Sequence, residues 1–143
     1  MTGLILYLGS TPVLWLSKRQ GAIACSTYHA EFSALRTAAE KAVTIRYLLR
    51  SFGVPIDGAT DVFGDNFSVI QNSQNPEAEL EKKHVALSFH YVRENIAAGV
   101  ISPYWLKGKL NMSDIMTKQI ASNEFNVHCD SLFYRPDIKS FRF

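Results

Sequence analysis

The sequence is poor in cysteine. Its two cysteines, Cys25 and Cys129, lie far apart and have no metal-ligand spacing around them. So small a set excludes a disulfide framework and does not indicate a zinc knuckle. A reducing compartment is therefore the expected environment of the chain.

Long apolar runs and targeting signals are also lacking. The longest apolar stretches, residues 4–8 and 96–101, fall far short of the ~20 residues that a membrane-spanning helix needs. The N-terminal residues have neither a basic region nor a small-residue cleavage site before Pro12, so a strand explains them better than a signal peptide. We expect an intracellular protein with no signal peptide, no transmembrane segment and no membrane partner.

Strong net charge and the common nucleotide and hydrolase motifs are missing as well. The formal net charge is +2, from 15 basic and 13 acidic residues, which excludes the uniformly basic surface of a protein that coats nucleic acid. Any nucleic-acid contact must therefore be local. No Gly-x-Ser-x-Gly and no phosphate-binding glycine loop is present, which argues against a serine hydrolase and a nucleotide-binding domain.

The residues that are present predict one mixed α/β domain. The chain has 143 residues, of which 47% are hydrophobic, enough to bury a single core. Hydrophobic periodicity and turn residues predict the elements. Strands are expected at residues 3–9, 13–17 with a continuation at 22–25, 60–64 and 100–106. Helices are expected at residues 27–51, 66–71, 84–98, 112–120 and 122–129. Because strands and helices do not alternate regularly, a mixed α/β domain is favoured over a regularly alternating one.

One acidic residue occupies an apolar row. Glu31 lies at the N-terminal end of the row that continues through Leu35, Ala38 and Ala42, so the predicted helix points its carboxylate toward the core, where an unpaired charge is costly. A structural role is the alternative: a first-turn residue stabilised by the helix dipole, or an ion-pair partner of Arg36 or Lys41.

Two further acids lie at the ends of predicted elements. Asp65 follows the strand at residues 60–64, and Asp114 comes three residues after Asn111. Each has a structural alternative, Asp65 as the N-cap of the next helix and Asp114 as part of a capping box. Together with Glu31 they can converge at one end of a sheet, as a site for a hard cation such as Mg²⁺ requires.

Two small basic clusters lie beside predicted turns. The first contains Lys18, Arg19 and Gln20, and the second contains Lys83 and His84. Such clusters usually form a solvated surface, although both are able to contact phosphates.

Several motifs, in their order along the chain, resemble the ribonuclease H domain of copia-type LTR retrotransposon Pol polyproteins. The matching segments are Thr2–Gly9, Val13–Gln20, Ser26–Phe32, Gly64–Ser68, Lys83–His84 with His90–Glu94, and Ser113–Lys118. They are similar to the family's Thr-Gly strand, its Trp-x-Ser-Lys-Lys-Gln strand and turn, and its Ala-Glu-Tyr, Cys-Asp-Asn-x-Ser, Lys-His-x₅-His and Ala-Asp-Ile-Phe-Thr-Lys segments. The resemblance covers residues 1–120 as one domain, and leaves residues 121–143 as a C-terminal helix and an aromatic tail.

The resemblance implies a five-stranded mixed sheet with helices on its faces and a site of four carboxylates that holds two Mg²⁺ or Mn²⁺ ions. Glu31, Asp65 and Asp114 correspond to three of the four. The implied activity is endonucleolytic hydrolysis of the RNA strand of RNA/DNA hybrids during reverse transcription. Nucleic-acid contacts are then expected from the residues of the basic clusters and the helix that follows Asp65: Lys18, Arg19, Gln20, Asn66, Ser68, Lys83 and His84.

The implied partners are the hybrid and the reverse transcriptase domain of the same polyprotein, in a cytoplasmic virus-like particle, in the nucleus, or in both. No residue here corresponds to the family's first catalytic aspartate, which lies on a central strand before the Thr-Gly strand. We therefore expect an N-terminally truncated domain with impaired or absent nuclease activity. The alternative is a catalytically inactive nucleic-acid-binding or interaction module with the same fold.

Overall fold

The computed structural model describes residues 1–20, 27–77 and 86–132. It begins with an antiparallel hairpin of β1 (Thr2–Leu8) and β2 (Thr11–Lys18), as the sequence predicts. Gly9, with φ of 62°, provides the positive backbone angle that the connecting turn requires. The predicted continuation of the second strand at residues 22–25 lies outside the described ranges.

The long helix α1 (Thr27–Ser51) matches its predicted bounds. Its buried row contains Phe32, Leu35, Ala39 and Ala42, at the spacing that places side chains on one face of a helix. The helix ends at Ser51, and Gly53, two residues beyond, has φ of 74°. A left-handed glycine is a common helix terminator because it has no Cβ to clash.

Two parallel strands form the second sheet. β3 (Thr60–Gly64) pairs with β4 (Ile101–Trp105), Thr60 opposite Ile101 and Gly64 opposite Trp105. The crossover between them contains α2 (Phe67–Gln74) and α3 (Ala86–Ala97), in accordance with the need of parallel strands for a long connection. All four elements lie within a residue or two of their predicted positions, except that α2 ends three residues later.

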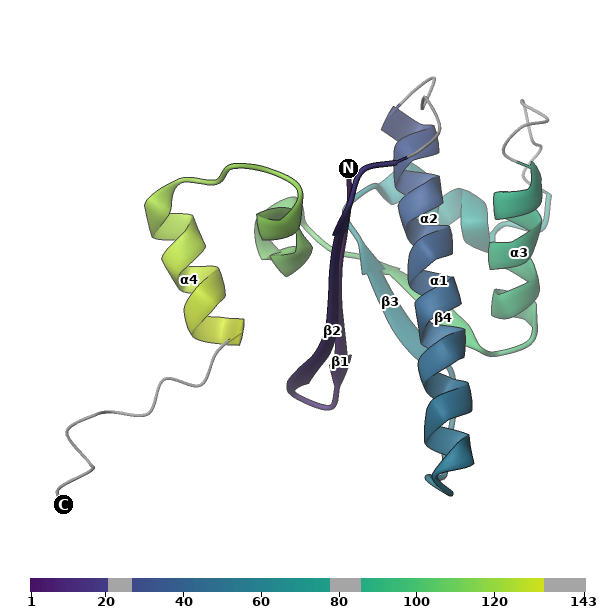
Figure 1. Ribbon diagram of the computed structural model, residues 1–143. Coiled ribbons are helices and arrows are strands. Elements are labelled where there is room, and N and C mark those ends of the chain that lie inside the picture. The colour runs from purple at the N-terminus through teal and green to yellow at the C-terminus, as the bar shows by residue number, and fades with distance from the viewer. Residues whose placement is uncertain (21–26, 78–85, 133–143) are drawn as a thin grey trace, which may run out of the picture.

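Within the described ranges the four strands form two separate two-stranded sheets, β1 with β2 and β3 with β4, and not the single five-stranded sheet that the resemblance implies. Both sheets pack against α1, which runs alongside them (Figure 1). No described strand lies between β1 and β3 to join the sheets by hydrogen bonds. The fold is therefore mixed α/β with an interrupted sheet.

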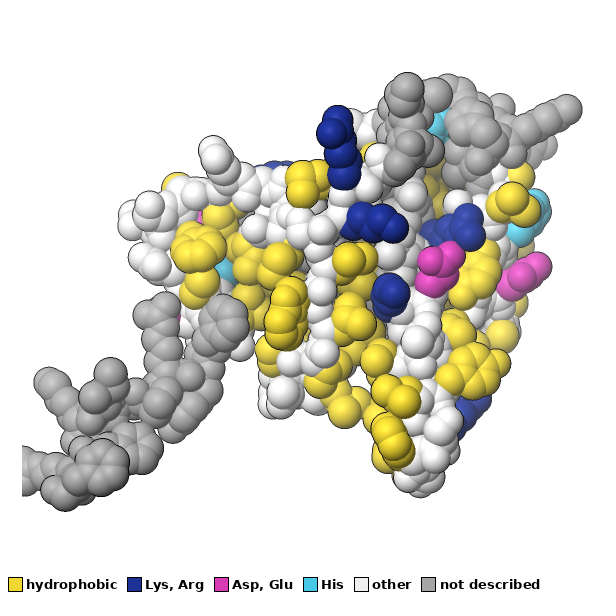
Figure 2. Space-filling model, in the orientation of Figure 1, with side chains coloured by type: hydrophobic (Ala, Val, Ile, Leu, Met, Phe, Trp, Pro, Cys, Tyr) yellow, Lys and Arg dark blue, Asp and Glu magenta, His cyan; other side chains and the backbone are white. Residues whose placement is uncertain are grey.

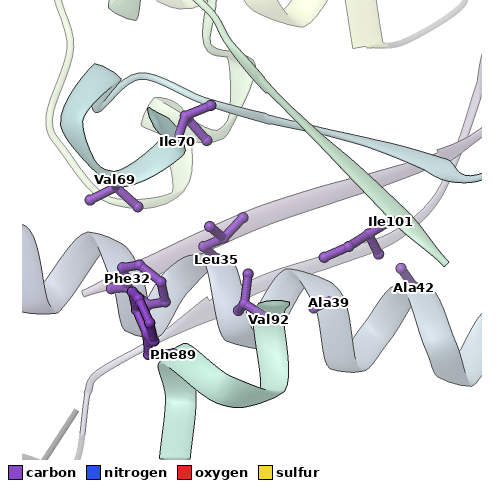
Figure 3. Close-up of a cluster of buried hydrophobic side chains, with 9 residues drawn as sticks. All are labelled: Phe32, Leu35, Ala39, Ala42, Val69, Ile70, Phe89, Val92 and Ile101. Atoms are coloured by element: carbon purple, nitrogen blue, oxygen red, sulfur yellow. The ribbon is translucent and has the colours of Figure 1, made fainter. Parts of the chain in front are cut away.

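The hydrophobic core lies between α1, α2, α3 and β4 (Figure 3). Its members are Phe32, Leu35, Ala39, Ala42, Val69, Ile70, Phe89, Val92 and Ile101. Phe32 and Phe89 stack in a tilted arrangement with ring centroids 5.5 Å apart, a favoured geometry for aromatic pairs. No residue of β1 or β2 belongs to this cluster.

The C-terminal part follows β4 with two 3₁₀ turns, η2 (Gly108–Leu110) and η3 (Met112–Met116), and then α4 (Ser122–Leu132). η3 packs against β1, and α4 contacts η3. The predicted helix at residues 112–120 was too long: the Thr117 hydroxyl donates to the Asp114 carbonyl at 3.2 Å, a local bond that competes with helix continuation. None of the helices in the described part of the chain combines the length and the apolar character needed to span a bilayer.

Candidate acidic site

Asp65 is placed by the end of β3. It follows Gly64, the last residue of the strand, and its carbonyl accepts a hydrogen bond from Trp105 Nε1 at 3.0 Å. The structural alternative for its side chain is wrong, because Asn66 caps α2: the Val69 N–H donates to Asn66 Oδ1 at 3.2 Å. The Asp65 carboxylate is thus not committed to capping.

Glu31 lies in the second turn of α1 and is half-buried. A first-turn role is therefore wrong, since the helix begins at Thr27 and has no acidic residue in its first turn. The ion-pair alternative is wrong as well. Arg36 pairs instead with Glu40, with Nε 2.8 Å from Oε1, and among the described residues neither Arg36 nor Lys41 forms an ion pair with Glu31.

Asp114 lies on η3, against β1. Its Oδ2 accepts a hydrogen bond from Lys118 Nζ at 2.9 Å. The predicted capping box is wrong: the backbone N–H of Asn111 donates to the Gly108 carbonyl at 2.9 Å, and Asn111 itself caps η3 by accepting from the Ser113 N–H at 3.2 Å. The carboxylate of Asp114 is directed to Lys118.

Glu31 lies within electrostatic range of Asp65 and Asp114. Burial raises the pKa of Glu31, and the negative charges of Asp65 and Asp114 raise it further, while Lys118 lowers it. The hydrogen bond to Asp114 raises the pKa of Lys118, and the charges of Asp65 and Glu31 add to that rise. Because such effects fall off with distance, Asp65 and Asp114 both lie near enough to Glu31 to act on it, although they are far from it in sequence.

Sequence reasoning missed Lys118 as a member of this cluster. Its signal was the i, i+4 spacing from Asp114, which places a cation and a carboxylate side by side on a helical turn. Lys118 and the N-terminal amine both act on Glu31, and the three acids still outnumber these two bases, which favours the attraction of cations.

The donor chemistry of the cluster suits a hard divalent cation, since all three acids offer carboxylate oxygens. Its arrangement is open, however: among the residues that the structure describes, no group of three or more His, Cys, Asp and Glu is placed to hold a metal ion. Glu31 and Asp65 line a cavity of about 540 Å³ that α1, β1 and β3 border, and Asp114 does not line it.

The residues expected to contact nucleic acid differ in their exposure and in their hydrogen bonds within the protein. Lys18, Arg19 and Ser68 are exposed. Gln20 is engaged inside the molecule, where its Nε2 donates to Thr2 Oγ1 at 2.9 Å and to the Ala30 carbonyl at 2.8 Å. Asn66 serves as the cap of α2, and Lys83 and His84 lie outside the described residues. Figure 2 shows Lys and Arg side chains gathered on the upper half of the face that the hairpin and α1 present.

Comparisons with known proteins find similarity between this chain and segments of transposon polyproteins. It is 26% identical over 123 residues to the retrovirus-related Pol polyprotein from transposon RE2 of Arabidopsis thaliana, and 25% identical over 123 residues to that from transposon RE1. Identity to the corresponding polyprotein from transposon TNT 1-94 of Nicotiana tabacum is 25% over 126 residues. These matches cover 86–88% of this chain but only 8–9% of the relatives' own length.

No family model matches the chain, and no solved structure matches it. The three polyprotein matches show that the chain is homologous, over most of its length, to a short segment of Pol polyproteins from copia-type transposons.

Proposed function

We propose that the chain is the ribonuclease H segment of a retrotransposon Pol polyprotein, and that it acts on the RNA strand of RNA/DNA hybrids with the help of Mg²⁺ or Mn²⁺. The observation that carries the proposal is that Glu31 and Asp65 line one cavity, with the charges of both Asp65 and Asp114 acting on Glu31. Glu31 and Asp65 lack the local structural roles that would otherwise explain them, and Asp114 is paired with Lys118. Half-buried carboxylates that repel one another are a costly arrangement, typical of sites that collect cations.

In this proposal Glu31, Asp65 and Asp114 hold the metal ions. Two bound ions would supply an activated water and stabilise the leaving oxygen of a phosphodiester. The protein's own contribution is position and charge. α1 and β3 fix the backbones of Glu31 and Asp65, and Lys118 orients Asp114 through its 2.9 Å hydrogen bond while neutralising part of the cluster's charge.

Hybrid binding in this proposal depends on exposed side chains near the cluster. Lys18 and Arg19 at the end of β2, and Ser68 in the first turn of α2, are free of the internal roles that engage Gln20 and Asn66. They suit contacts to phosphates and 2′-hydroxyls, which are independent of base sequence. The small net charge of +2 is compatible with a reverse transcriptase domain that holds the rest of the hybrid.

A cleavage assay on a labelled RNA/DNA hybrid tests the proposal. The chain is compared with Asp65→Asn and with Asp61→Asn, an exposed acid on the same strand. We expect slow cleavage that depends on Mg²⁺ or Mn²⁺, that falls by roughly 100-fold or more in Asp65→Asn, and that is unchanged in Asp61→Asn. Cleavage that survives in Asp65→Asn, or that needs no metal, contradicts the assignment.

The open arrangement of the acids favours a second candidate, a nucleic-acid-binding module without nuclease activity. Under this candidate the chain does not cleave, and the hybrid still binds when Glu31, Asp65 and Asp114 are all replaced by alanine. Binding that falls in Lys18→Ala with Arg19→Ala, and not in the triple alanine variant, distinguishes it from the nuclease.

A further inference from the structure

Two exposed aromatic side chains lie directly beside Asp65. Phe67, in the first turn of α2, is 58% exposed, and Trp105, the last residue of β4, is 46% exposed. Trp105 Nε1 donates to the Asp65 carbonyl at 3.0 Å. This bond holds the indole ring next to the backbone of a candidate metal ligand.

The two rings form a pair whose faces are partly open. Their centroids are 6.1 Å apart and their planes are at 90°, an edge-to-face arrangement that aromatic rings favour. In such a pair the ring that presents its edge keeps both faces free, and the other ring keeps one. Because each side chain is about half exposed, planar surface remains on which a further ring can stack.

Two lysines flank the aromatic pair. Lys107 precedes η2 and Lys109 lies in it, and both are exposed. Between them, a Cβ at Gly108 would lie 3.7 Å from Asp65 Oδ2, so this turn lies against the same residue as the rings. Among the described residues neither lysine forms an ion pair, which leaves both ammonium groups available to an anion.

A second exposed aromatic pair provides a contrast. Phe63 and Tyr104 have ring centroids 5.7 Å apart, and Phe63 is 57% exposed. Their face of β3 also carries Asp61, an exposed residue two positions before Phe63, and its carboxylate repels phosphates. Of the two pairs, the one formed by Phe67 and Trp105 combines aromatic surface with positive charge.

We propose that Phe67, Trp105, Lys107 and Lys109 form a binding site for single-stranded nucleic acid, in which an unpaired base stacks on the aromatic pair and the adjoining phosphates contact the lysines. Every nucleobase has a planar face, so such stacking tolerates any sequence, and it is commonly combined with cations that follow the backbone. An internal base pair of a duplex has no free face, because its neighbours already cover it. The ligand is therefore a single strand and not the duplex part of a hybrid.

The inference rests on the nucleic-acid-binding part of the proposed function, and not on metal binding or cleavage. The rings and the lysines adjoin Asp65, so a single strand held there lies next to the acids. A hybrid that carries a single-stranded extension would then be bound at two places, its duplex at the acids and its unpaired bases at the aromatic pair.

Tryptophan fluorescence tests the proposal, because the chain has two tryptophans and one of them belongs to the site. Trp15→Phe, at an exposed position of β2, makes Trp105 the single reporter. This protein is titrated with a DNA strand of about ten thymidines, and separately with a blunt RNA/DNA hybrid of the same length. Metal ions are left out, so that no strand is cleaved, and light scattering follows the oligomeric state.

We expect the single strand to quench the fluorescence of Trp105 to saturation, and the blunt hybrid to need at least a fivefold higher concentration. Affinity for the strand should fall roughly fivefold or more in Phe67→Ala, and stay within twofold in Phe63→Ala, the control of matched exposure. Replacing Lys107 and Lys109 together by alanine should lower the slope of log affinity against log salt concentration by about 1.4.

Three results overturn the proposal. The first is a strand that does not bind, or that binds without changing the fluorescence of Trp105. The second is an equal loss of affinity in Phe67→Ala and Phe63→Ala. The third is quenching that follows protein concentration without any oligonucleotide, as a second copy of the chain on the rings would cause. If the hybrid is cleaved and the single strand does not bind, this inference fails while the nuclease assignment stands.

Discussion

The two halves of the molecule differ in how their residues are packed. The packed half, formed by α1, α2, α3, β3 and β4, contains the whole nine-residue core. In the hairpin half, formed by β1, β2 and η3, Thr2 is the one buried residue of the two strands, and Trp15 is 66% exposed. Within this half, Ser17 Oγ donates to the Met116 carbonyl at 2.7 Å. Gln20 links the hairpin to α1, since its Nε2 donates to Thr2 Oγ1 and to the Ala30 carbonyl.

This difference indicates which half stabilises the fold and how the candidate acids are distributed between the halves. Buried apolar area is the main stabilising contribution in a domain of this size, so the packed half is expected to unfold last. The candidate acids come from both halves: Glu31 and Asp65 belong to the packed half, and Asp114 lies on η3 in the hairpin half. The proposed site would therefore depend on how firmly the hairpin half packs on α1.

The largest effect is expected from the core of the packed half. Phe32 is fully buried and stacks on Phe89, so Phe32→Ala should lower the free energy of unfolding by about 3–5 kcal/mol. Trp15→Ala in the hairpin half should change it by less than ~0.5 kcal/mol, because the side chain is mostly exposed. Chemical denaturation measures both, and equal losses would erase the difference between the halves.

A smaller effect is expected where the hairpin half is closely packed. A Cβ at Gly3 would lie 2.6 Å from Thr117 Cγ2 and 2.7 Å from the Ser113 carbonyl oxygen, so Gly3→Ala should cost roughly 1–3 kcal/mol. The loss should appear as faster hydrogen exchange in β1 and η3, with α1 still protected. Gly64→Ala is the matched control, because its nearest neighbour is the flexible end of Ile70 at 3.2 Å. Faster exchange in α1 as well would mean that the halves unfold as one unit.

The smallest effect concerns pH. Burial and the charges of Asp65 and Asp114 hold the pKa of Glu31 above its ordinary value of 4.5, so the ionised carboxylate destabilises the folded state. This cost is absent below pH 4.5 and grows as the pH rises through the raised pKa. Glu31→Gln should therefore raise the melting temperature at pH 7 by roughly 1–3 °C, and the gain should vanish below pH 4.5. Glu124→Gln, at an exposed position of α4, should show no such pH dependence.

Much of the fold could be predicted from local patterns. The bounds of α1 and β3 follow from helical and strand periodicity with clear stop signals at Gly53 and Gly64, and these signals act within a few residues. The length of η3 could not be predicted in this way, because the segment is shaped by its packing on β1 and by the Thr117 hydroxyl. The separation of the sheets could not be predicted either, since it depends on pairing between distant strands.

The sequence identifies the candidate acids, but it does not decide whether each acid serves as a helix cap or an ion-pair partner instead. Two neighbouring residues, Asp65 and Asn66, were both able to cap α2, and the backbone geometry selects Asn66. Arg36 had acidic neighbours on both sides along α1, and Glu40 is the one it pairs with. Such choices depend on rotamers and on distances of a few ångströms, which spacing alone does not determine.

The central claim is that acids from both halves act as one cation site. A titration with Mn²⁺, followed by paramagnetic broadening of the side-chain carboxyl signals in NMR spectra, tests it most directly. We predict that Glu31, Asp65 and Asp114 broaden together at the same Mn²⁺ concentration, before Asp57 and Glu124, and that excess Mg²⁺ reverses the effect. Broadening confined to the acids of one half, or spread evenly over all exposed acids, would contradict the account.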